Sequence, residues 1–526
     1  MSNISRRQFL KGMAAGAAGL ALSGIVSSAG IPEASADEGA ESKEYDVVKT
    51  YDVDFAIIGS GMTGSSAAVQ AAELGMSTIL VEKLGYTGGS TNVAEGIFGL
   101  GSKIQEEAGQ LEELPTVAEL LKETQEYTHY NCNSHVIKRF YEKSGDNINW
   151  LLEQGCTLGV NDMPMKNMRH SYTATKGAGP IKDLTAKAQE AGVTYLMNTT
   201  ALELIVEDGA VTGLYAENDE GYLRINAKAV LIATGGYAGN PDMLKKYAHV
   251  ASGEFIKDCG MPGRNGDGIN MALAAGGTEW THMGVLQNFG PITKNDVYGS
   301  HLYAATAVAG FRFNEKGERY GDETMDLLNF AFSGNTMQQQ KASFSFVTDA
   351  QIDQWVTEGG AYGGGVFLNG MGPLTTLREK LEAEMNSEDP QVFKCETLDI
   401  VAEKAGVDAG TLKASIARYN ELCAKGQDED FLKDPAWMIP VSEEGPYYLF
   451  RHKIGIFTTC DGLRVNEYAQ VLNDEGEPVK GLFAGGCDAG GLLGDAYDVT
   501  VAPCTTQGWC LYCGRESAKF VHDNLL

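Results

Sequence analysis

The chain has no run of about 20 apolar residues beyond its N-terminal segment, so the rest of it is not expected to cross a membrane. It is also poor in basic residues, because 41 Lys and Arg stand against 70 Asp and Glu and the formal net charge is −29. An acidic chain repels nucleic acid and anionic lipid surfaces, which excludes nucleic-acid-binding functions. What remains is a globular protein whose 526 residues are enough for two or three domains.

The N-terminal segment has the composition of an export signal. Arg6 and Arg7 precede an apolar, small-residue run, and the sequence "ASA" that follows suits cleavage after Ala36. The segment resembles a twin-arginine signal, which exports proteins already folded around a cofactor. A general secretory signal with two chance arginines is the alternative. We predict a signal peptide over 1–36, a polar linker over 37–50, and a location in the periplasm or at the extracytoplasmic face of the cell membrane.

Ten cysteines are scattered along the chain, a distribution unlike that of a small disulfide scaffold. The tight C-x2-C-x2-C spacing is absent, and so is the "CxxCH" of a c-type haem site. Cys510 and Cys513 are one helical turn apart, with Cys504, Cys487 and Cys460 on neighbouring predicted elements. We predict buried free thiols and no metal site; an iron–sulfur cluster and a redox disulfide are the alternatives.

A strand, a glycine-rich turn, a helix and a second strand follow one another over 54–83, which is the pattern of a βαβ unit. Gly59, Gly61 and Gly64 form G-x-G-x-x-G directly after the first strand. These glycines permit a sharp turn, a close approach of backbone to a pyrophosphate, and close packing of helix on strand. Glu82 ends the second strand, where it can accept hydrogen bonds from an adenosine ribose. The unit therefore predicts a dinucleotide cofactor.

Beyond this unit the fold class predicted is α/β. The other expected elements are helices within 114–160, short strands joined by an Asp-Gly turn over 192–218, a buried strand over 227–240, helices over 376–386 and 396–424, strands over 447–465 and 481–486, and a final helix over 505–524.

Several further segments share a pattern with one known family. They are "TGGSTNVAEG" at 87–96, "LIATGG" at 231–236, "GRNGDGINMA" at 263–272, "FRFNEKGERYGDE" at 311–323 and "GLFAGGCDAGG" at 481–491. Together they resemble the FAD-binding domain of the fumarate reductase and succinate dehydrogenase flavoprotein superfamily, over about residues 51–526.

The resemblance implies a Rossmann-like FAD-binding domain, formed by 51–279 and 446–526 and interrupted by an α+β capping domain over 280–445. It implies non-covalent FAD and hydride transfer through flavin N5 to or from a C–C bond. No Asp-Gly-Ala-Thr-like motif for covalent FMN is present, so the electrons are expected from a separate membrane-associated cytochrome or quinol-linked donor.

The final helix is expected to direct its N-terminus at the flavin, where its dipole would stabilise the negative charge of the reduced ring. Asp267 and Asp488 are expected near the ribityl or phosphate groups. The cofactor-binding residues that the motifs and the resemblance predict are Gly59, Gly61, Met62, Thr63, Gly64, Glu82, Lys83, Gly88, Gly89, Ser90, Thr91, Ala94, Gly96, Ala201, Thr234, Gly235, Gly236, Asp267, Gly486, Asp488, Thr505 and Thr506.

The sequence departs from fumarate reductases where those enzymes place Arg and His for two carboxylates. The corresponding positions fall near Leu327, at Phe457 or Thr458, and near Val501, and no cation stands at or beside them. A buried dicarboxylate without compensating charge costs several kcal/mol per ion. We therefore predict that fumarate and succinate are not substrates.

The catalytic candidates are tyrosines. Tyr497 is expected beside the flavin, where a phenol can donate a proton or hydrogen-bond a ketone oxygen, as in the ketosteroid dehydrogenases of this superfamily. Tyr303 is the second candidate, with His301 beside it, and Asn288 falls near a family histidine position. The alternative for Tyr497 is simple packing on the flavin ring, and for the others an ordinary structural role in the cap.

The function predicted is reduction of an activated C=C bond in an enone, an unsaturated lactone or a phenylpropenoid-like molecule by an exported FAD oxidoreductase of anaerobic respiration. This resembles the exported flavin reductases of anaerobes, including the cardiac glycoside reductase type. A dehydrogenase that introduces a C=C bond, of the 3-ketosteroid type, and a non-catalytic flavin electron carrier are the alternatives. We expect a monomer or weak homodimer.

Overall fold

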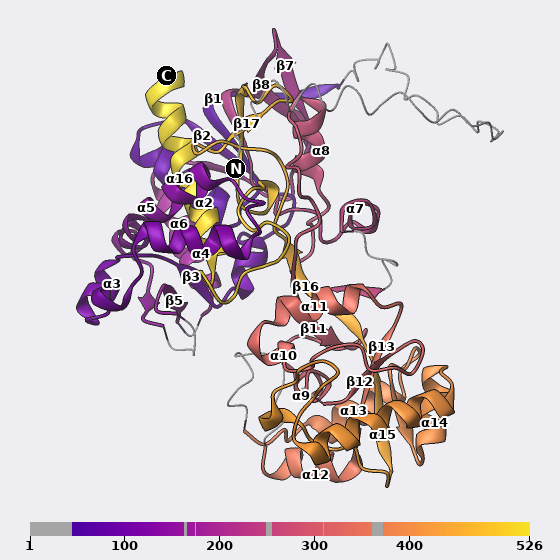
Figure 1. The fold of residues 1–526 in the computed structure, drawn as a ribbon. Helices are drawn as coiled ribbons and strands as arrows, with labels where there is room; N and C mark the ends of the chain where they lie inside the picture. The colour runs from indigo at the N-terminus through magenta and orange to yellow at the C-terminus, as the bar shows by residue number, and fades with distance from the viewer. Residues whose placement is uncertain (1–44, 162–165, 174, 249–254, 309, 360–371) are drawn as a thin grey trace, which may run out of the picture. The chain divides into compact units, whose positions relative to one another are not determined.

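The computed structural model describes residues 45–161, 166–173, 175–248, 255–308, 310–359 and 372–526. The predicted signal peptide lies outside these residues. The described chain mixes helices and sheets, as the α/β prediction requires (Figure 1). None of the helices in these ranges is long and apolar enough to cross a membrane.

The largest sheet has a parallel core of five strands in the order β18, β9, β1, β2, β6. The βαβ unit predicted from the sequence is confirmed: β1 and β2 pair in parallel, and α2 connects them. The strands carry continuous apolar runs such as "FAII" and "AVLI", which suits burial on both faces of a parallel sheet. Their bounds are Pro478–Ala484 for β18, Gly221–Ile232 for β9, Val47–Ile58 for β1, Thr78–Val81 for β2 and Thr194–Leu196 for β6.

One edge of this sheet is antiparallel. The predicted hairpin is confirmed, since β7 (Thr200–Glu207) and β8 (Ala210–Asn218) pair around an Asp-Gly turn, and β8 pairs with β9. β17 (Gln470–Leu472) pairs with β18. β1 begins at Val47 and pairs with β9 from there, so the last residues of the predicted linker are strand.

Two helices pack together against the parallel strands (Figure 1). α2 (Met62–Glu73) is rich in Ala, Ser and Gly, and its small side chains allow α16 (Thr505–Leu525) to approach closely. A Cβ added at Gly514 would lie 2.2 Å from the carbonyl oxygen of Thr63. This contact brings the N-termini of both helices toward the carboxyl ends of the strands.

Residues between β9 and β17 form further sheets. One sheet contains β10 (Ile256–Asp258), β16 (Lys453–Thr459) and β11 (Leu286–Ile292). The other has the order β12, β13, β15, β14, with bounds Arg312–Asn314, Ser343–Thr348, Tyr447–Arg451 and Val392–Cys395. A small sheet of β3 (Gly96–Phe98), β5 (Arg169–Tyr172) and β4 (Leu158–Gly159) comes from earlier in the chain, between β2 and β6.

The helix predicted over 396–424 is two helices. α14 (Leu398–Ala405) ends at Gly406, which has a φ of +74°, and α15 (Ala409–Lys425) begins after Asp408, whose side chain accepts from Thr411 N. A left-handed glycine ends a helix and an aspartate caps the next. The remaining helices are α3 Lys103–Glu107, α4 Val117–Tyr127, α5 Ser134–Glu153, α6 Ala178–Glu190, α7 Pro241–Tyr247, α8 Asp267–Ala274, α9 His301–Thr306, α10 Met325–Leu328, α11 Phe330–Gln338, α12 Asp349–Thr357 and α13 Leu377–Met385.

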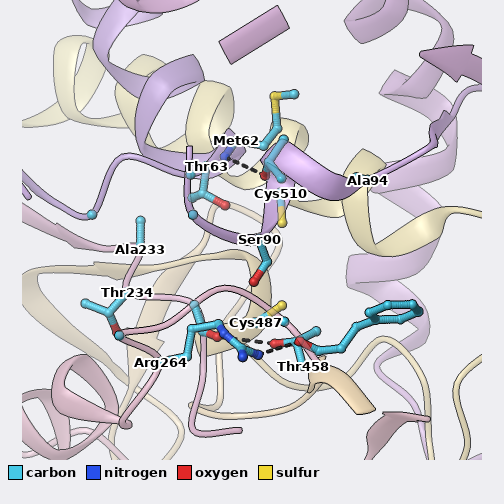
Figure 2. A pocket seen from close by; sticks show the side chains of 18 of the residues that line it. Met62, Thr63, Ser90, Ala94, Ala233, Thr234, Arg264, Thr458, Cys487 and Cys510 are labelled. Carbon is cyan, nitrogen blue, oxygen red and sulfur yellow. Dashed lines mark hydrogen bonds between the residues drawn. The ribbon is translucent and has the colours of Figure 1, made fainter. Parts of the chain in front are cut away.

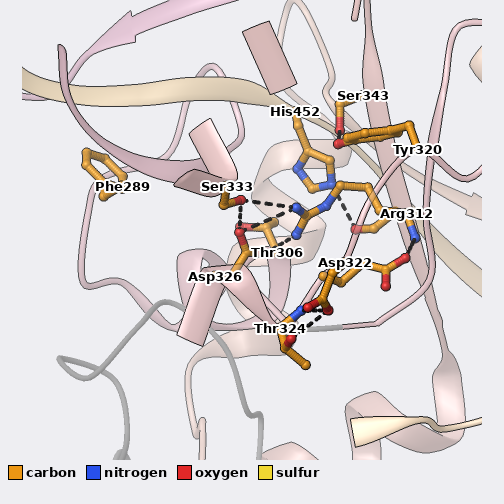
Figure 3. Close-up of polar contacts among 12 residues, drawn as sticks. Phe289, Thr306, Arg312, Tyr320, Asp322, Thr324, Asp326, Ser333, Ser343 and His452 are labelled. Carbon is orange, nitrogen blue, oxygen red and sulfur yellow. Dashed lines mark hydrogen bonds and ion pairs between the residues drawn. The ribbon is translucent and has the colours of Figure 1, made fainter. Parts of the chain in front are cut away.

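Charged side chains are buried in pairs in the region predicted as the cap. Arg319 bonds Glu323 at 2.8 Å and Asp428 at 2.7 Å, and Lys433 lies 3.2 Å from Glu323. We call these four residues the ionic cluster. A second buried pair joins Arg312 to Asp326 and Ser333, as Figure 3 shows.

Candidate active site

A cavity of about 380 Å3 lies where the parallel strands end. Its walls include the residues that directly follow the carboxyl ends of β1, β2, β9 and β18. The carboxyl ends of parallel strands share one edge of a sheet, and ligands of such folds bind in the crevice there. Four turns that are far apart in the sequence therefore meet at one site: they begin at Gly59, Glu82, Ala233 and Gly485.

The first glycine motif is built for close backbone contact. Gly59 has a φ of +104°, and a Cβ there would lie 2.2 Å from the Ala233 carbonyl oxygen. A Cβ on Gly64 would lie 1.9 Å from the Gly59 oxygen, so helix and strand meet at this residue. Gly61 is different, because the nearest atom to a Cβ there is 3.8 Å away, at Gly88 O. The backbone at the start of α2 is therefore open toward the cavity, as pyrophosphate binding requires.

Glu82 lines the cavity, and its carboxylate shapes the first turn. It accepts from Ser60 N at 3.0 Å, from Ser60 Oγ at 2.6 Å and from Leu84 N at 2.9 Å. Carboxylate oxygens have lone pairs for further bonds, so Glu82 keeps acceptor capacity for ribose hydroxyls. The predicted role of Glu82 is compatible with this geometry.

The second glycine turn follows immediately. Gly88 and Gly89 have φ values of +110° and +46°, and Thr91 Oγ1 accepts from Met62 N at 3.2 Å. Ser90 lines the cavity, and its buried hydroxyl has no hydrogen-bond partner among the residues that the structure describes (Figure 2). An orphaned buried hydroxyl at a cavity wall is a place for a polar ligand atom. A phosphate or ribityl oxygen of FAD fits it.

The helix α16 also presents its N-terminus to this site. Its N-cap is Cys504, with a φ of +64° and no side-chain cap, and its first turn carries no acidic residue. Thr506 and Gln507 line the cavity. The free N–H groups and the positive end of the dipole suit the negative charge of a reduced flavin.

Most of the predicted cofactor residues meet at this cavity. Those on its wall are Gly59, Gly61, Met62, Thr63, Glu82, Lys83, Gly89, Ser90, Thr91, Ala94, Gly96, Ala201, Thr234, Gly235, Asp267 and Thr506. Those that do not line it in the described structure are Gly64, Gly88, Gly236, Gly486, Asp488 and Thr505.

Asp488 was expected near the ribityl or phosphate groups, but its carboxylate has another use. It accepts from Thr234 Oγ1 and Gly235 N at 2.9 Å and from Gly236 N at 3.0 Å. Burial raises the pKa of Asp488 to about 6, although the three hydrogen bonds act to lower it. Asp488 therefore fixes the turn after β9 from the adjacent strand, and the turn itself faces the cavity.

The two catalytic candidates are in different places. Tyr497 lines the cavity, and 6% of its surface is exposed. Burial raises the pKa of Tyr497, although a hydrogen bond with Thr506 acts to lower it. Tyr303 is not on the cavity wall in the described structure, since it is fully buried and its hydroxyl donates to Phe289 O at 3.4 Å. Tyr303 therefore lies on the inward side of α9, away from this wall.

The secondary candidates also point elsewhere. His301 accepts from Thr376 N at 3.1 Å, and Asn288 bonds Asn335 at 3.4 Å. Neither His301 nor Asn288 lines the cavity in the described part of the chain. Other wall residues were not predicted from the sequence, among them Gln287, Val297, Tyr298 and Arg264.

Arg264 brings a cation to one of the three positions that were expected to lack one, the position at Phe457 or Thr458. Its side chain is buried, and one terminal nitrogen donates to Phe457 O while the other pairs with Asp258. Its Nε donates to Met261 O at 2.6 Å. Figure 2 shows the guanidinium directed toward Thr458. This contact was hard to predict from the sequence, because Arg264 lies 193 positions before Phe457.

The cations on the cavity wall already have partners. Lys83 pairs with Asp267 at 2.5 Å, Lys176 pairs with Glu95 at 3.1 Å, and Arg264 pairs with Asp258. Every Lys or Arg on the described wall is thus neutralised within the protein. A ligand with two carboxylates would find no uncompensated positive charge here.

Three of the predicted neighbouring cysteines do meet. The thiols of Cys460 and Cys510 hydrogen-bond Cys487 and hold its pKa well below the usual value. All ten cysteines are free thiols, five of them buried. In the described residues, no three His, Cys, Asp or Glu side chains are arranged to hold a metal ion.

Comparison with known proteins places the chain in a family. The FAD binding domain family matches residues 54–499, and the twin-arginine translocation pathway signal sequence matches residues 3–23. Vinyl phenol reductase of Lactiplantibacillus plantarum is 35% identical over 480 residues, covering 89% of this chain and 95% of that protein. Urocanate reductase of Eggerthella lenta is 27% identical over 467 residues, covering 85% and 71%.

Solved structures show the same fold. The open conformation of a flavocytochrome c3 fumarate reductase matches with a TM-score of 0.68 at 21% identity, covering 100% of this chain and 82% of that one. A 3-ketosteroid Δ1-dehydrogenase from Sterolibacterium denitrificans matches with a TM-score of 0.72 at 18% identity, covering 90% and 99%. The chain therefore belongs to the FAD binding domain family, carries a twin-arginine signal sequence, and is a flavoprotein with FAD as its cofactor.

Proposed function

We propose that this exported flavoprotein reduces the C=C bond of an oxygen-bearing, flat, conjugated substrate, of which a vinyl phenol or a related phenylpropenoid is the best example. The bound FAD supplies the hydride for this reaction. A separate membrane-associated cytochrome or quinol-linked donor supplies the electrons. We further propose that Tyr497, the cavity tyrosine beside the start of α16, donates the proton that the second alkene carbon takes up.

The observation that carries the proposal is the chemistry of the cavity wall. Its cations are each paired within the protein, and Tyr298 and Phe457 contribute aromatic surface to it. Such a wall favours an apolar, planar substrate with few charges over a dicarboxylate. The 35% identity to a vinyl phenol reductase over 89% of the chain supports the same substrate class.

The test is anaerobic reoxidation of the mature protein after reduction by dithionite or a reduced viologen. Flavin absorbance is followed while 4-vinylphenol, cinnamate, a steroid enone, an unsaturated lactone, urocanate and fumarate are offered in turn. We expect rapid reoxidation by 4-vinylphenol and none by fumarate. Rapid reoxidation by fumarate alone would refute the proposal, because it would require a carboxylate clamp that the paired cations do not provide.

The proton donor is tested by Tyr497→Phe, which removes the hydroxyl and keeps the ring. We expect the rate of reoxidation by 4-vinylphenol to fall by about 100-fold or more, within the usual contribution of general acid catalysis. An unchanged rate would show that Tyr497 only packs against the cofactor.

A further inference from the structure

Four aromatic rings form a cluster with one face on the cavity. Phe289 in β11 lies 4.5 Å from Phe457 in β16, measured between ring centroids. Tyr298, in the turn before α9, lies 4.8 Å from Phe457 and 4.9 Å from Tyr303. We call these four residues the aromatic cluster. Tyr298 and Phe457 line the cavity, and the other two rings pack behind them.

The cluster contains two hydroxyl groups in opposite situations. The Tyr303 hydroxyl is fully buried and donates to the backbone oxygen of Phe289. The Tyr298 hydroxyl forms no hydrogen bond with any residue in the part of the chain that the structure describes. The Tyr298 side chain is half-buried at the cavity wall, so an acceptor atom on a ligand can take the place that water fills beside this hydroxyl.

The hydroxyl of Tyr298 is suited to donate. Burial raises the pKa of Tyr298, so the phenol keeps its proton at any pH at which the enzyme would work. Its ring is held by edge-to-face contacts with Phe289 and Phe457, at interplanar angles of 70° and 77°. A ring fixed on two sides holds its hydroxyl in one direction at low entropic cost.

We propose that Tyr298 is a substrate-binding residue that donates a hydrogen bond to the oxygen conjugated with the alkene, while the flat part of the substrate lies against Phe457. This inference rests on the proposed function and adds the group that selects an oxygen-bearing alkene over a hydrocarbon. Where this oxygen is a carbonyl, it gains electron density as the conjugated bond takes up hydride, so a donor placed there is worth more in the transition state than in the ground state. Where it is the hydroxyl of a vinyl phenol, the hydrogen bond binds the ring and orients it.

The test compares Tyr298→Phe with Tyr303→Phe, which removes the other hydroxyl of the same cluster. Isothermal titration of the FAD-loaded protein measures the dissociation constants of 4-ethylphenol and ethylbenzene, which resemble the reduced product with and without its oxygen. We expect Tyr298→Phe to weaken the binding of 4-ethylphenol about tenfold, which corresponds to the loss of one hydrogen bond. The dissociation constant of ethylbenzene should stay unchanged. Tyr303→Phe should leave both constants as in the wild type.

Either of two results would overturn the assignment: equal 4-ethylphenol affinity in the wild type and Tyr298→Phe, or an equal loss in both variants. Steady-state rates then give a second readout, since Tyr298→Phe should reduce the preference for 4-vinylphenol over styrene. The proposed function fails separately if the wild type binds 4-ethylphenol but its reduced flavin is not reoxidised by 4-vinylphenol. Normal turnover with an unaltered preference in Tyr298→Phe would instead reject the role of Tyr298 alone.

Discussion

The ionic cluster and the aromatic cluster are both buried between residues 280 and 460, and they use opposite chemistry. In the ionic cluster every charge has a partner of opposite sign, and its members do not line the cavity in the described structure. In the aromatic cluster four rings pack within 4.5 to 5.5 Å of one another, and two of them form cavity wall. The ionic cluster thus contributes to the core, and two rings of the aromatic cluster, Tyr298 and Phe457, form cavity wall that a ligand can contact.

The largest expected effect comes from breaking the ionic cluster. Glu323→Gln keeps the shape of the side chain but removes the negative charge that contacts both Arg319 and Lys433. Removing one member of a buried ion pair typically costs about 3–5 kcal/mol. Urea denaturation should show a loss of this size in the free energy of unfolding. A change below about 1 kcal/mol would mean that the cluster is not desolvated as described.

The second effect separates the two faces of the aromatic cluster. Phe289→Ala removes a fully packed ring and should cost about 3–5 kcal/mol in the free energy of unfolding. Phe457→Ala opens the cavity wall, so we expect a smaller loss of stability and about a tenfold lower affinity for 4-ethylphenol. Unfolding and titration curves of the two variants check this. A lower ligand affinity in Phe289→Ala together with an unchanged affinity in Phe457→Ala would contradict the assignment of Phe457 to the cavity wall and of Phe289 to the packing behind it.

The third prediction uses carboxyl groups that differ in their partners. Burial would raise the pKa of Asp428, but Arg319 lowers it to about 2. Asp461 has only neutral donors, Tyr237 and the N–H groups of Gly284 and Val285, and burial raises its pKa to about 7. The native state therefore keeps a proton on Asp461 that the unfolded chain loses above about pH 4, so stability falls as pH rises from about 4 to 7.

Asp461→Asn should reduce this fall. The amide oxygen can accept from the same N–H groups, and the amide nitrogen takes the place of Oδ1, which has no partner among the described residues. Urea midpoints measured between pH 4.5 and 7.5 should decline less steeply in the variant. Identical slopes would show that Asp461 is ionised in the native protein across this range.

The smallest effect is expected on the surface. Glu421 pairs with Arg418 at 3.1 Å, and its side chain is 69% exposed. Glu421→Gln should change the free energy of unfolding by no more than about 0.5 kcal/mol, because solvent and salt screen an exposed pair. This variant is the matched control for Glu323→Gln, since both replace a Glu that bonds an Arg on the same part of the chain.

The parallel sheet was predictable because its signals are local. Gly59, Gly61 and Gly64 follow an apolar strand directly, and the Asp-Gly turn at 208–209 lies between two strand patterns. The sequence also contained the break between α14 and α15, in the form of Gly406 and Asp408, although we predicted one continuous helix there. Such features depend on a few neighbouring residues and on backbone conformation.

The cavity wall contributed by more distant residues was not predictable in the same way. Tyr298 and Tyr303 are five positions apart in one stretch, and only the tertiary packing decides which ring reaches the cavity. Arg264 belongs to a glycine-rich turn, yet it contacts the carbonyl of Phe457 in a strand far along the chain. The side chain of one residue and the backbone of another meet here without any shared sequence pattern.

The pairing of Arg264 with Asp258 has a consequence for how this site can change its substrate. The guanidinium stands at the wall with its charge cancelled by one carboxylate. Replacing that carboxylate by an amide would leave the positive charge of Arg264 for an anionic ligand to compensate, without any added basic residue. A single substitution at Asp258 would therefore favour carboxylated molecules at this wall.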